Sequence, residues 1–159
     1  MRRYVAVTLL ILSVCLSTQA QSEEVPDPGW FVPVGLNTGL GVVGGSPSFL
    51  LGAEVSAVYL GEALWGGFYG DALYDFSQAQ QRLSVGSEFG WLFLGAELGG
   101  VAIIGEARDI YGLRVGGLLT NGFSTAYLRW IGLGHENQED IFEAGLLFKW
   151  PFMIADVPK

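Results

Sequence analysis

The chain has almost no cysteine, histidine or positive charge. Its one cysteine is Cys15, its one histidine is His135, and it has only 8 Lys and Arg residues against 16 Asp and Glu residues. A single cysteine excludes an internal disulfide framework and a thiolate metal cluster. The net charge of −8 argues against a partner that needs a basic patch, namely nucleic acid or an anionic lipid surface.

Long hydrophobic runs are absent after residue 20. Half of the residues are hydrophobic and only 15% are charged, which is a low charge content for a soluble domain. Yet no later apolar run approaches the ~20 residues of a membrane-spanning helix. A chain this hydrophobic without such helices is either an unusually apolar soluble protein or a membrane β-barrel.

The first twenty residues have the features of an export signal. Arg2-Arg3 gives a positive start, residues 5–16 are apolar but too short to span a bilayer, and Thr18-Gln19-Ala20 offers small residues at −3 and −1 of a cleavage site. A valine precedes Cys15, where a lipoprotein signal needs a small residue. We therefore expect a signal peptide at 1–20, Sec-type export and a mature chain without cysteine.

Eight later segments alternate between apolar and polar residues with a period of two, which predicts β-strands. The predicted strands are 30–43, 48–60, 64–76, 81–91, 92–102, 109–120, 122–132 and 140–151. The sequence thus predicts an all-β fold, an eight-stranded antiparallel up-and-down transmembrane β-barrel over 30–152. An acidic lead-in at 21–29 precedes it and a tail at 153–159 follows it.

The charged residues inside the predicted strands all share one alternating face. They are Glu54, Asp71, Asp75, Arg82, Glu88, Glu97, Arg114, Arg129, Glu143 and Lys149. Twelve of the sixteen strand glycines share that face, and the opposite face carries no charge. The narrow lumen of an eight-stranded barrel holds only small residues and a few long ones that pair. We therefore expect an ion-paired lumen and an apolar exterior.

Alternation alone does not say which face points outward. A soluble barrel that binds an apolar ligand would show the same period with the faces exchanged, but its exterior would carry Lys, Thr, Ser and Glu rather than glycine. The connections favour the membrane barrel, because the links at 44–47, 77–80, 103–108 and 133–139 are longer than those between them. Outer loops and periplasmic turns alternate in this way. Five tryptophans also lie near predicted strand ends, as an interfacial girdle requires: Trp30, Trp65, Trp91, Trp130 and Trp150.

The last predicted strand carries a further motif. In Glu143-Ala144-Gly145-Leu146-Leu147-Phe148-Lys149-Trp150, a polar residue is followed by glycine two positions later and then by aromatic residues at alternate positions. This resembles the assembly signal of outer-membrane barrels, with Glu143, Gly145, Phe148 and Trp150 as its residues. The usual signal ends on the aromatic residue, whereas residues 151–159 follow it here.

By this motif, its strand pattern and its length, residues 30–152 resemble the small eight-stranded outer-membrane proteins such as the OmpA transmembrane domain and OmpX. The resemblance implies a Gram-negative source, periplasmic termini and insertion into the outer membrane by the barrel-assembly machinery. We also expect a monomer that contacts outer-membrane lipids and lipopolysaccharide.

Oxygen-bearing side chains and the only histidine gather in the last two predicted outer loops. They are Glu106, Asp109, His135, Glu136, Asn137, Glu139 and Asp140. Such oxygens suit weak contact with Ca²⁺ or Mg²⁺, but a solvated charge cluster is the simpler interpretation. Outer-membrane lipid A deacylases, which are barrels of this size, place a serine just after the histidine. Here Glu136 follows it, and the last serine, Ser124, lies near a predicted periplasmic turn.

We therefore assign no catalytic residue, no metal and no cofactor. Eight strands leave a lumen filled by side chains, so we expect no porin activity. The expected function is that of a small non-enzymatic outer-membrane barrel with a structural or surface-contact role in the cell envelope. A secreted soluble barrel that binds an apolar ligand and an outer-membrane lipid-modifying enzyme remain the alternatives.

Overall fold

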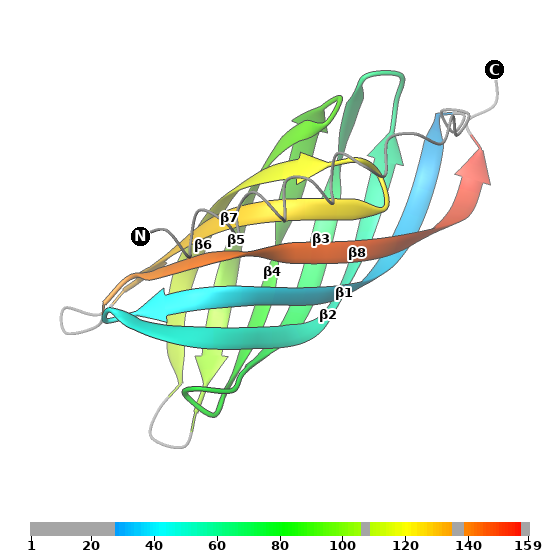
Figure 1. Ribbon diagram of the computed structural model, residues 1–159. Coiled ribbons are helices and arrows are strands. Elements are labelled where there is room, and N and C mark those ends of the chain that lie inside the picture. Colours follow the sequence, from blue (N-terminus) through cyan, green and yellow to red (C-terminus); the bar gives the residue numbers. More distant parts are fainter. Residues whose placement is uncertain (1–27, 106–108, 135–138, 157–159) are drawn as a thin grey trace, which may run out of the picture.

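Figure 1 shows the computed structural model, which describes residues 28–105, 109–134 and 139–156. The predicted signal peptide and nearly all of the predicted lead-in lie outside the described residues. So do four of the predicted outer-loop residues: Glu106, His135, Glu136 and Asn137.

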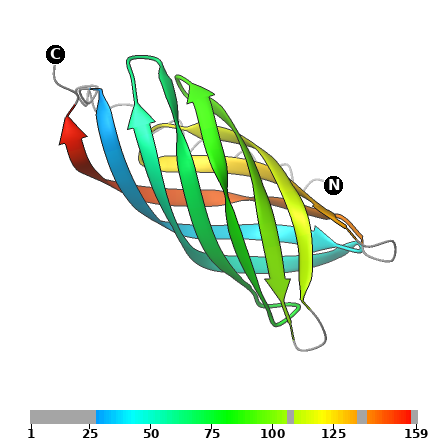
Figure 2. The ribbon, with the colours of Figure 1, turned by 180° about the vertical axis from the view of Figure 1, so that it is seen from behind.

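Eight antiparallel strands close into one barrel, which confirms the predicted all-β, up-and-down barrel. The strands are β1 (Gly29–Val43), β2 (Ser46–Leu60), β3 (Leu64–Asp75), β4 (Gln80–Trp91), β5 (Leu94–Ile104), β6 (Ile110–Thr120), β7 (Ser124–Leu133) and β8 (Ile141–Asp156). Each pairs with its neighbour in sequence, and β8 pairs with β1 to complete the ring. The strands run obliquely around an elongated barrel (Figures 1 and 2), as the tilt of closed sheets demands. Within the described part, no helix is long and apolar enough to cross a membrane.

The first connection is shorter than predicted. Only Gly44 and Gly45 separate β1 from β2, both with positive φ (+58° and +77°), and Val43 pairs directly with Ser46. Two consecutive residues of positive φ make the tight hairpin turn whose twist matches that of its strands. The expected alternation of long and short links therefore fails here, because the next link, 61–63, is the longer one.

The last strand is longer than predicted. β8 continues to Asp156, which pairs with Gly29, so residues 153–156 belong to the barrel rather than to a tail. The predicted strand ended at Pro151, a residue that cannot donate a backbone hydrogen bond to a ladder. Pro151 lies opposite Pro33 of β1, and the assigned β1–β2 pairing is interrupted at Val32 and Pro33 with the same register on either side. The two prolines, neither of which can donate a backbone hydrogen bond, thus lie opposite each other, and β1 and β8 continue to pair beyond them.

The alternating pattern sorts side chains between the inside and the outside of the barrel. Every strand presents a strongly exposed apolar side chain, for example Leu40, Val55, Phe68, Val85, Leu98, Leu113, Leu128 and Phe142. The neighbouring positions on the same strands are buried or half-buried, and they include all ten charged strand residues. The charged face is therefore the inner face, which is the orientation expected for the membrane barrel and the reverse of the one that the soluble alternative requires.

Candidate functional site in the barrel lumen

All ten charged strand residues lie inside the barrel with at most 9% of their surface exposed. Six are acidic and four are basic, and each takes part in at least one ion pair. An unpaired charge in such a place is expensive, whereas a paired and hydrogen-bonded one is tolerated. The lumen therefore contains two groups of ion pairs. One is central, and the other lies toward the end of the barrel that carries the β1–β2, β3–β4, β5–β6 and β7–β8 links, which is called the outer end because these links were predicted as outer loops.

Arg114 lies at the centre of the larger group. Its guanidinium pairs with Asp71 and reaches Glu97, with 3.3 Å between Arg114 Nε and Glu97 Oε1. It also donates hydrogen bonds to Ser84 Oγ (2.9 Å) and to the Tyr69 hydroxyl (3.2 Å), and it lies 4.5 Å from the centre of the Tyr69 ring. Donors from one guanidinium thus fix side chains of three neighbouring strands, β3, β4 and β5.

Arg129 joins this centre from β7. It pairs with Glu97 through two hydrogen bonds, one of them from Nη2 to Oε2 at 3.1 Å. It lies 3.5 Å from a carboxylate oxygen of Glu54 and stacks 3.8 Å above the centre of the Tyr127 ring. The Tyr127 hydroxyl donates in turn to Asn37 Oδ1 on β1 at 2.8 Å. Glu97 is therefore shared by two arginines.

Lys149 completes the central group from β8. Its ammonium lies 2.8 Å from Glu54 Oε1 and 2.9 Å from Glu88 Oε1, and it donates to Ser56 Oγ at 3.1 Å. Ser56 donates to Glu54 at 3.1 Å. Because Glu54 also meets Arg129, the central network is continuous and includes side chains from all eight strands, with Asn37 as the contribution of β1.

A second, outer group centres on Arg82. Its guanidinium bridges Asp75 on β3 and Glu143 on β8. Asp75 Oδ1 also accepts the backbone N–H groups of Ser77 and Gln78, both at 3.0 Å, which fixes the turn between β3 and β4. Arg82 Nε and Glu143 Oε2 are buried without a hydrogen-bond partner. The group around Arg82 thus keeps one buried donor and one buried acceptor without a partner.

Apolar layers cover the charged interior at both ends. Toward the outer loops lies a buried cluster of Val101, Ile103, Ile131 and Ile141. Toward the other end Leu118, Tyr127 and Leu147 pack together with Trp65. These layers and the ion pairs between them place large side chains along the lumen.

Three inward aromatic residues escaped the sequence interpretation: Trp65, Tyr69 and Tyr127. Each packs over a pair of glycines on neighbouring strands, where a Cβ atom would collide with the ring or its hydroxyl. The pairs are Gly90 and Gly95 under Trp65, Gly86 and Gly99 under Tyr69, and Gly39 and Gly145 under Tyr127. Their inward direction could have been predicted from the sequence, because each of these aromatic residues lies on the same alternating face as the charged residues and the glycines.

Trp65 is accordingly not a girdle residue. It is half-buried, points into the barrel, and donates its indole N–H to the carbonyl of Leu92 at 3.0 Å. The other four tryptophans are exposed on the outer surface, between 39% for Trp130 and 59% for Trp91 and Trp150. Trp150 lies within β8 rather than at its end, because that strand continues to Asp156.

The four residues of the assembly motif divide between the two faces of β8. Glu143 is buried in the pair with Arg82, and Gly145 lies under the Tyr127 ring. Phe148 and Trp150 point outward, 37% and 59% exposed. The motif is therefore part of a regular amphipathic strand that closes the barrel against β1.

Of the predicted outer-loop residues, the structure describes Asp109, Glu139 and Asp140, and all three are exposed. Asp140 Oδ2 accepts the indole N–H of Trp130 at 3.1 Å. Among the described residues, no group of three or more His, Cys, Asp or Glu side chains is placed to hold a metal ion. Ser124 lies at the opposite end of the barrel, beside Asn121, to which its hydroxyl donates at 3.0 Å.

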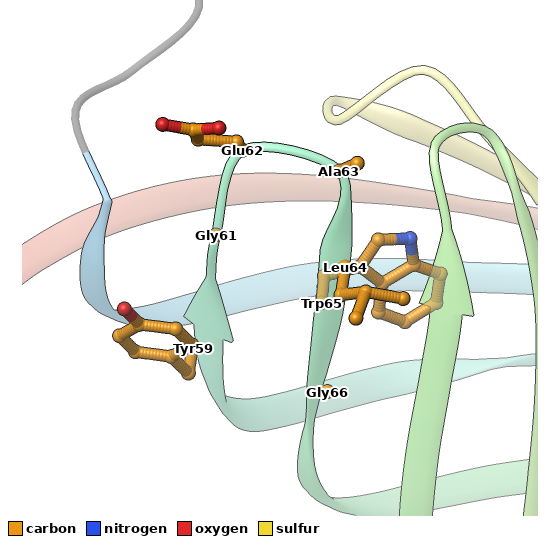
Figure 3. A pocket seen from close by; sticks show the side chains of 7 residues that line it. All are labelled: Tyr59, Gly61, Glu62, Ala63, Leu64, Trp65 and Gly66. Atoms are coloured by element: carbon orange, nitrogen blue, oxygen red, sulfur yellow. The ribbon is translucent and has the colours of Figure 1, made fainter.

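Two hollows mark the two ends of the barrel. The larger, about 570 Å³, lies at the turn between β2 and β3 and is lined by Tyr59, Gly61–Gly66 and the Trp65 side chain (Figure 3). Its one charged residue, Glu62, sits at the tip of the turn (Figure 3), so no set of polar groups converges on this hollow. The other, about 360 Å³, lies in the outer mouth above Arg82.

Comparison with protein-family models and with curated proteins found no match to this chain.

Proposed function

We propose that this protein is a non-enzymatic outer-membrane β-barrel of a Gram-negative bacterium, with a lumen closed by ion pairs and a structural or surface-contact role in the cell envelope. The observation that carries the proposal is the inverted polarity of the barrel. Charges are buried inside it, and apolar side chains cover it outside.

The outer surface is unsuited to water. Among the described residues, 32 large apolar side chains are exposed, against 12 hydrophobic residues that are buried. Moving a large apolar side chain out of water is worth roughly 1.5–3 kcal/mol, so a hydrocarbon surrounding favours this surface by an amount on the order of tens of kcal/mol. Soluble monomers expose apolar patches of limited size, whereas here the apolar surface includes residues of all eight strands.

The backbone also meets the demands of a bilayer. A membrane has no water to satisfy free N–H and C=O groups, so only helices and closed barrels cross it. This sheet closes on itself without an edge. A tilted strand needs about 9–11 residues to cross the hydrocarbon, and the eight strands have between 10 residues (β7) and 16 residues (β8).

Two features of the barrel support this role. Large side chains lie along its lumen, and the four links at the outer end have two, four, five and seven residues. This favours contact with lipopolysaccharide and neighbouring envelope components over solute transport or capture of large ligands. The outward Phe148 and Trp150 of β8 support recognition by the barrel-assembly machinery.

The test is expression of the full chain in a Gram-negative host, followed by fractionation and gel electrophoresis of boiled and unboiled detergent extracts. We expect the protein in the sarkosyl-insoluble outer-membrane fraction, with faster migration before boiling. Recovery as a soluble periplasmic protein whose mobility does not change on boiling would overturn the proposal.

A further inference from the structure

The turn between β4 and β5 differs from the other described turns of the barrel, because both of its residues are large and apolar. It consists of Leu92 and Phe93, with Trp91 at the end of β4 and Leu94 at the start of β5 on either side. Between 48% and 59% of each of these four residues is exposed. No other run of four large apolar residues is exposed in the part of the chain that the structure describes.

The end of the barrel that carries this turn also carries the β2–β3 and β6–β7 links and is called the inner end. Glu62 lies at the tip of the β2–β3 turn (Figure 3), and Asn121 and Gly122 begin the β6–β7 turn. Glycine, asparagine and charged residues suit a turn that lies in water. The β4–β5 turn has none of them, so its composition suits a different surrounding.

Hydrogen bonds fix the apolar turn on both sides. The backbone N–H of Leu92 donates to the carbonyl of Ala63 at 2.7 Å, and the carbonyl of Leu92 accepts the indole N–H of Trp65 at 3.0 Å. On the other side, the carbonyl of Phe93 accepts the N–H of Thr120 at 2.8 Å. The turn is thus part of the fixed inner rim, and the exposure of its side chains is a property of the folded barrel.

The apolar outer surface of the barrel continues into this turn. Along β5 every outward residue is apolar, from Leu94 beside the turn to Ile104 at the outer end. On β4 the outward residues next to the turn are Phe89 and Trp91, both 59% exposed. No polar side chain therefore separates the turn from the surface that the proposed function assigns to lipid.

The length of β4 agrees with this continuity. The strand has 12 residues and begins with Gln80 and Gln81 at the outer end. The ten residues that follow them end at Trp91, and a tilted strand needs about 9–11 residues to cross the hydrocarbon of a membrane. If the polar glutamines mark the outer boundary of the hydrocarbon, its inner boundary falls at the β4–β5 turn.

From these observations we infer that the β4–β5 turn is inserted in the membrane at the inner end, where Trp91, Phe93 and Leu94 contact lipid acyl chains. The inference rests on the proposed function and adds the position of one turn to it. The turn that carries Glu62 lies in water at the same end. The membrane thus covers the inner rim on the β4–β5 side and leaves it uncovered at β2–β3.

The test compares three backbone amide signals of the mature protein in lipid nanodiscs by NMR. Phe93 reports the apolar turn, Glu62 the β2–β3 turn and Val55 the middle of β2. One probe is a water-soluble gadolinium chelate, and the other is a phospholipid with a nitroxide on its acyl chain. We expect the nitroxide lipid to broaden the Phe93 and Val55 signals, and the chelate to broaden Glu62 at least fivefold more than Phe93.

The outcomes that contradict the inference differ from those that contradict the proposed function. Chelate broadening of Phe93 equal to that of Glu62, with Val55 protected, would overturn the insertion of the turn and leave the membrane barrel intact. Little broadening of Phe93 by either probe would also overturn it, because a second copy or a partner protein would then cover the turn. Broadening of Val55 by the chelate would contradict the membrane barrel itself and the inference with it.

A pair of variants makes the test specific to the turn. Phe93→Asp should draw the turn out of the lipid and raise the chelate broadening of the Leu94 amide at least fivefold. Phe123→Asp makes the same change in the β6–β7 turn at a similarly exposed residue, 48% against 52% for Phe93, and should leave the Leu94 signal unchanged. A folded Phe93→Asp barrel whose Leu94 amide stays protected from the chelate would contradict the insertion.

Discussion

Replacing Arg129 with methionine removes one of the cations that the central lumen network shares. Arg129 pairs with Glu97 through two hydrogen bonds, lies 3.5 Å from Glu54 and stacks on Tyr127. Breaking a buried ion pair by removing one partner typically costs about 3–5 kcal/mol, because a charge is left uncompensated. The lumen has six acidic and four basic side chains, and the substitution would leave six acidic and three basic ones.

The structure places the cost at the lower end of this range. Glu97 keeps Arg114, with Nε and Oε1 3.3 Å apart, and Glu54 keeps Lys149 at 2.8 Å. No carboxylate loses its last cation, so we expect a destabilisation of about 3 kcal/mol. Arg82→Met should cost more, because Arg82 is the only ion-pair partner of Glu143 among the described residues.

The measurement is urea-induced unfolding in lipid vesicles, followed by tryptophan fluorescence, with Leu128→Met as the control. Leu128 adjoins Arg129 but points outward, and this volume-conserving change should cost less than about 1.5 kcal/mol. If Arg129→Met lowers the free energy of unfolding by no more than the control, the lumen charges do not hold the barrel together and the reasoning fails.

Three further predictions follow from single positions. Val55→Arg, at a mid-strand outward position, should lower the free energy of unfolding in vesicles by about 2–4 kcal/mol, whereas Leu64→Arg at a strand end should lower it by about 0–1 kcal/mol; equal losses would contradict the placement of the apolar belt. Gly99→Ala, whose Cβ would meet the Tyr69 hydroxyl and a backbone carbonyl, should cost about 1–3 kcal/mol in urea unfolding, whereas Gly100→Ala has open space and should be neutral. Leu92 has φ of +50°, so Leu92→Gly should raise the urea midpoint by relieving about 1 kcal/mol of strain; a lower midpoint would show that the leucine side chain matters more than the strain.

The number of strands, their order and the faces of their charges could be predicted because β-structure has a period of two. The charged residues of the predicted strands all fall on one of the two alternating faces, and the other face carries no charge. The charged face fits the narrow lumen of an eight-stranded barrel, so it was expected to point inward. Glycine supplied the direction, since Gly39, Gly86 and Gly99 all lie under inward aromatic rings.

What could not be predicted depends on contacts between distant strands. The last residues of β8 belong to the barrel because they pair with β1, where Asp156 lies opposite Gly29, more than a hundred residues away in the chain. Trp65 lies on the same alternating face of its strand as the charged residues, which indicates an inward side chain. The sequence analysis instead assigned it to the interfacial girdle because it lies near a strand end. The division of the ten charges into a central network and an outer group around Arg82 depends on strand stagger, which fixes the height of each side chain in the lumen.

The hollow in the outer mouth was likewise absent from the sequence interpretation. Its residues come from six strands and from the links at the outer end, and no local motif joins them. The acidic character of the last two outer loops was visible, but the aliphatic wall became visible only when the barrel brought Ile103, Leu133 and Ile141 together.

The most direct test of the central claim is a spin-label scan of β2 in lipid vesicles. The only cysteine, Cys15, lies in the predicted signal peptide, so single cysteines at residues 50–57 of the mature chain would have no background. The account predicts that labels at Leu51, Ala53 and Val55 collide with lipid-dissolved oxygen, whereas labels at the even-numbered positions between them do not. Oxygen contact at the even positions instead, or no periodicity along the strand, would contradict an apolar-out membrane barrel.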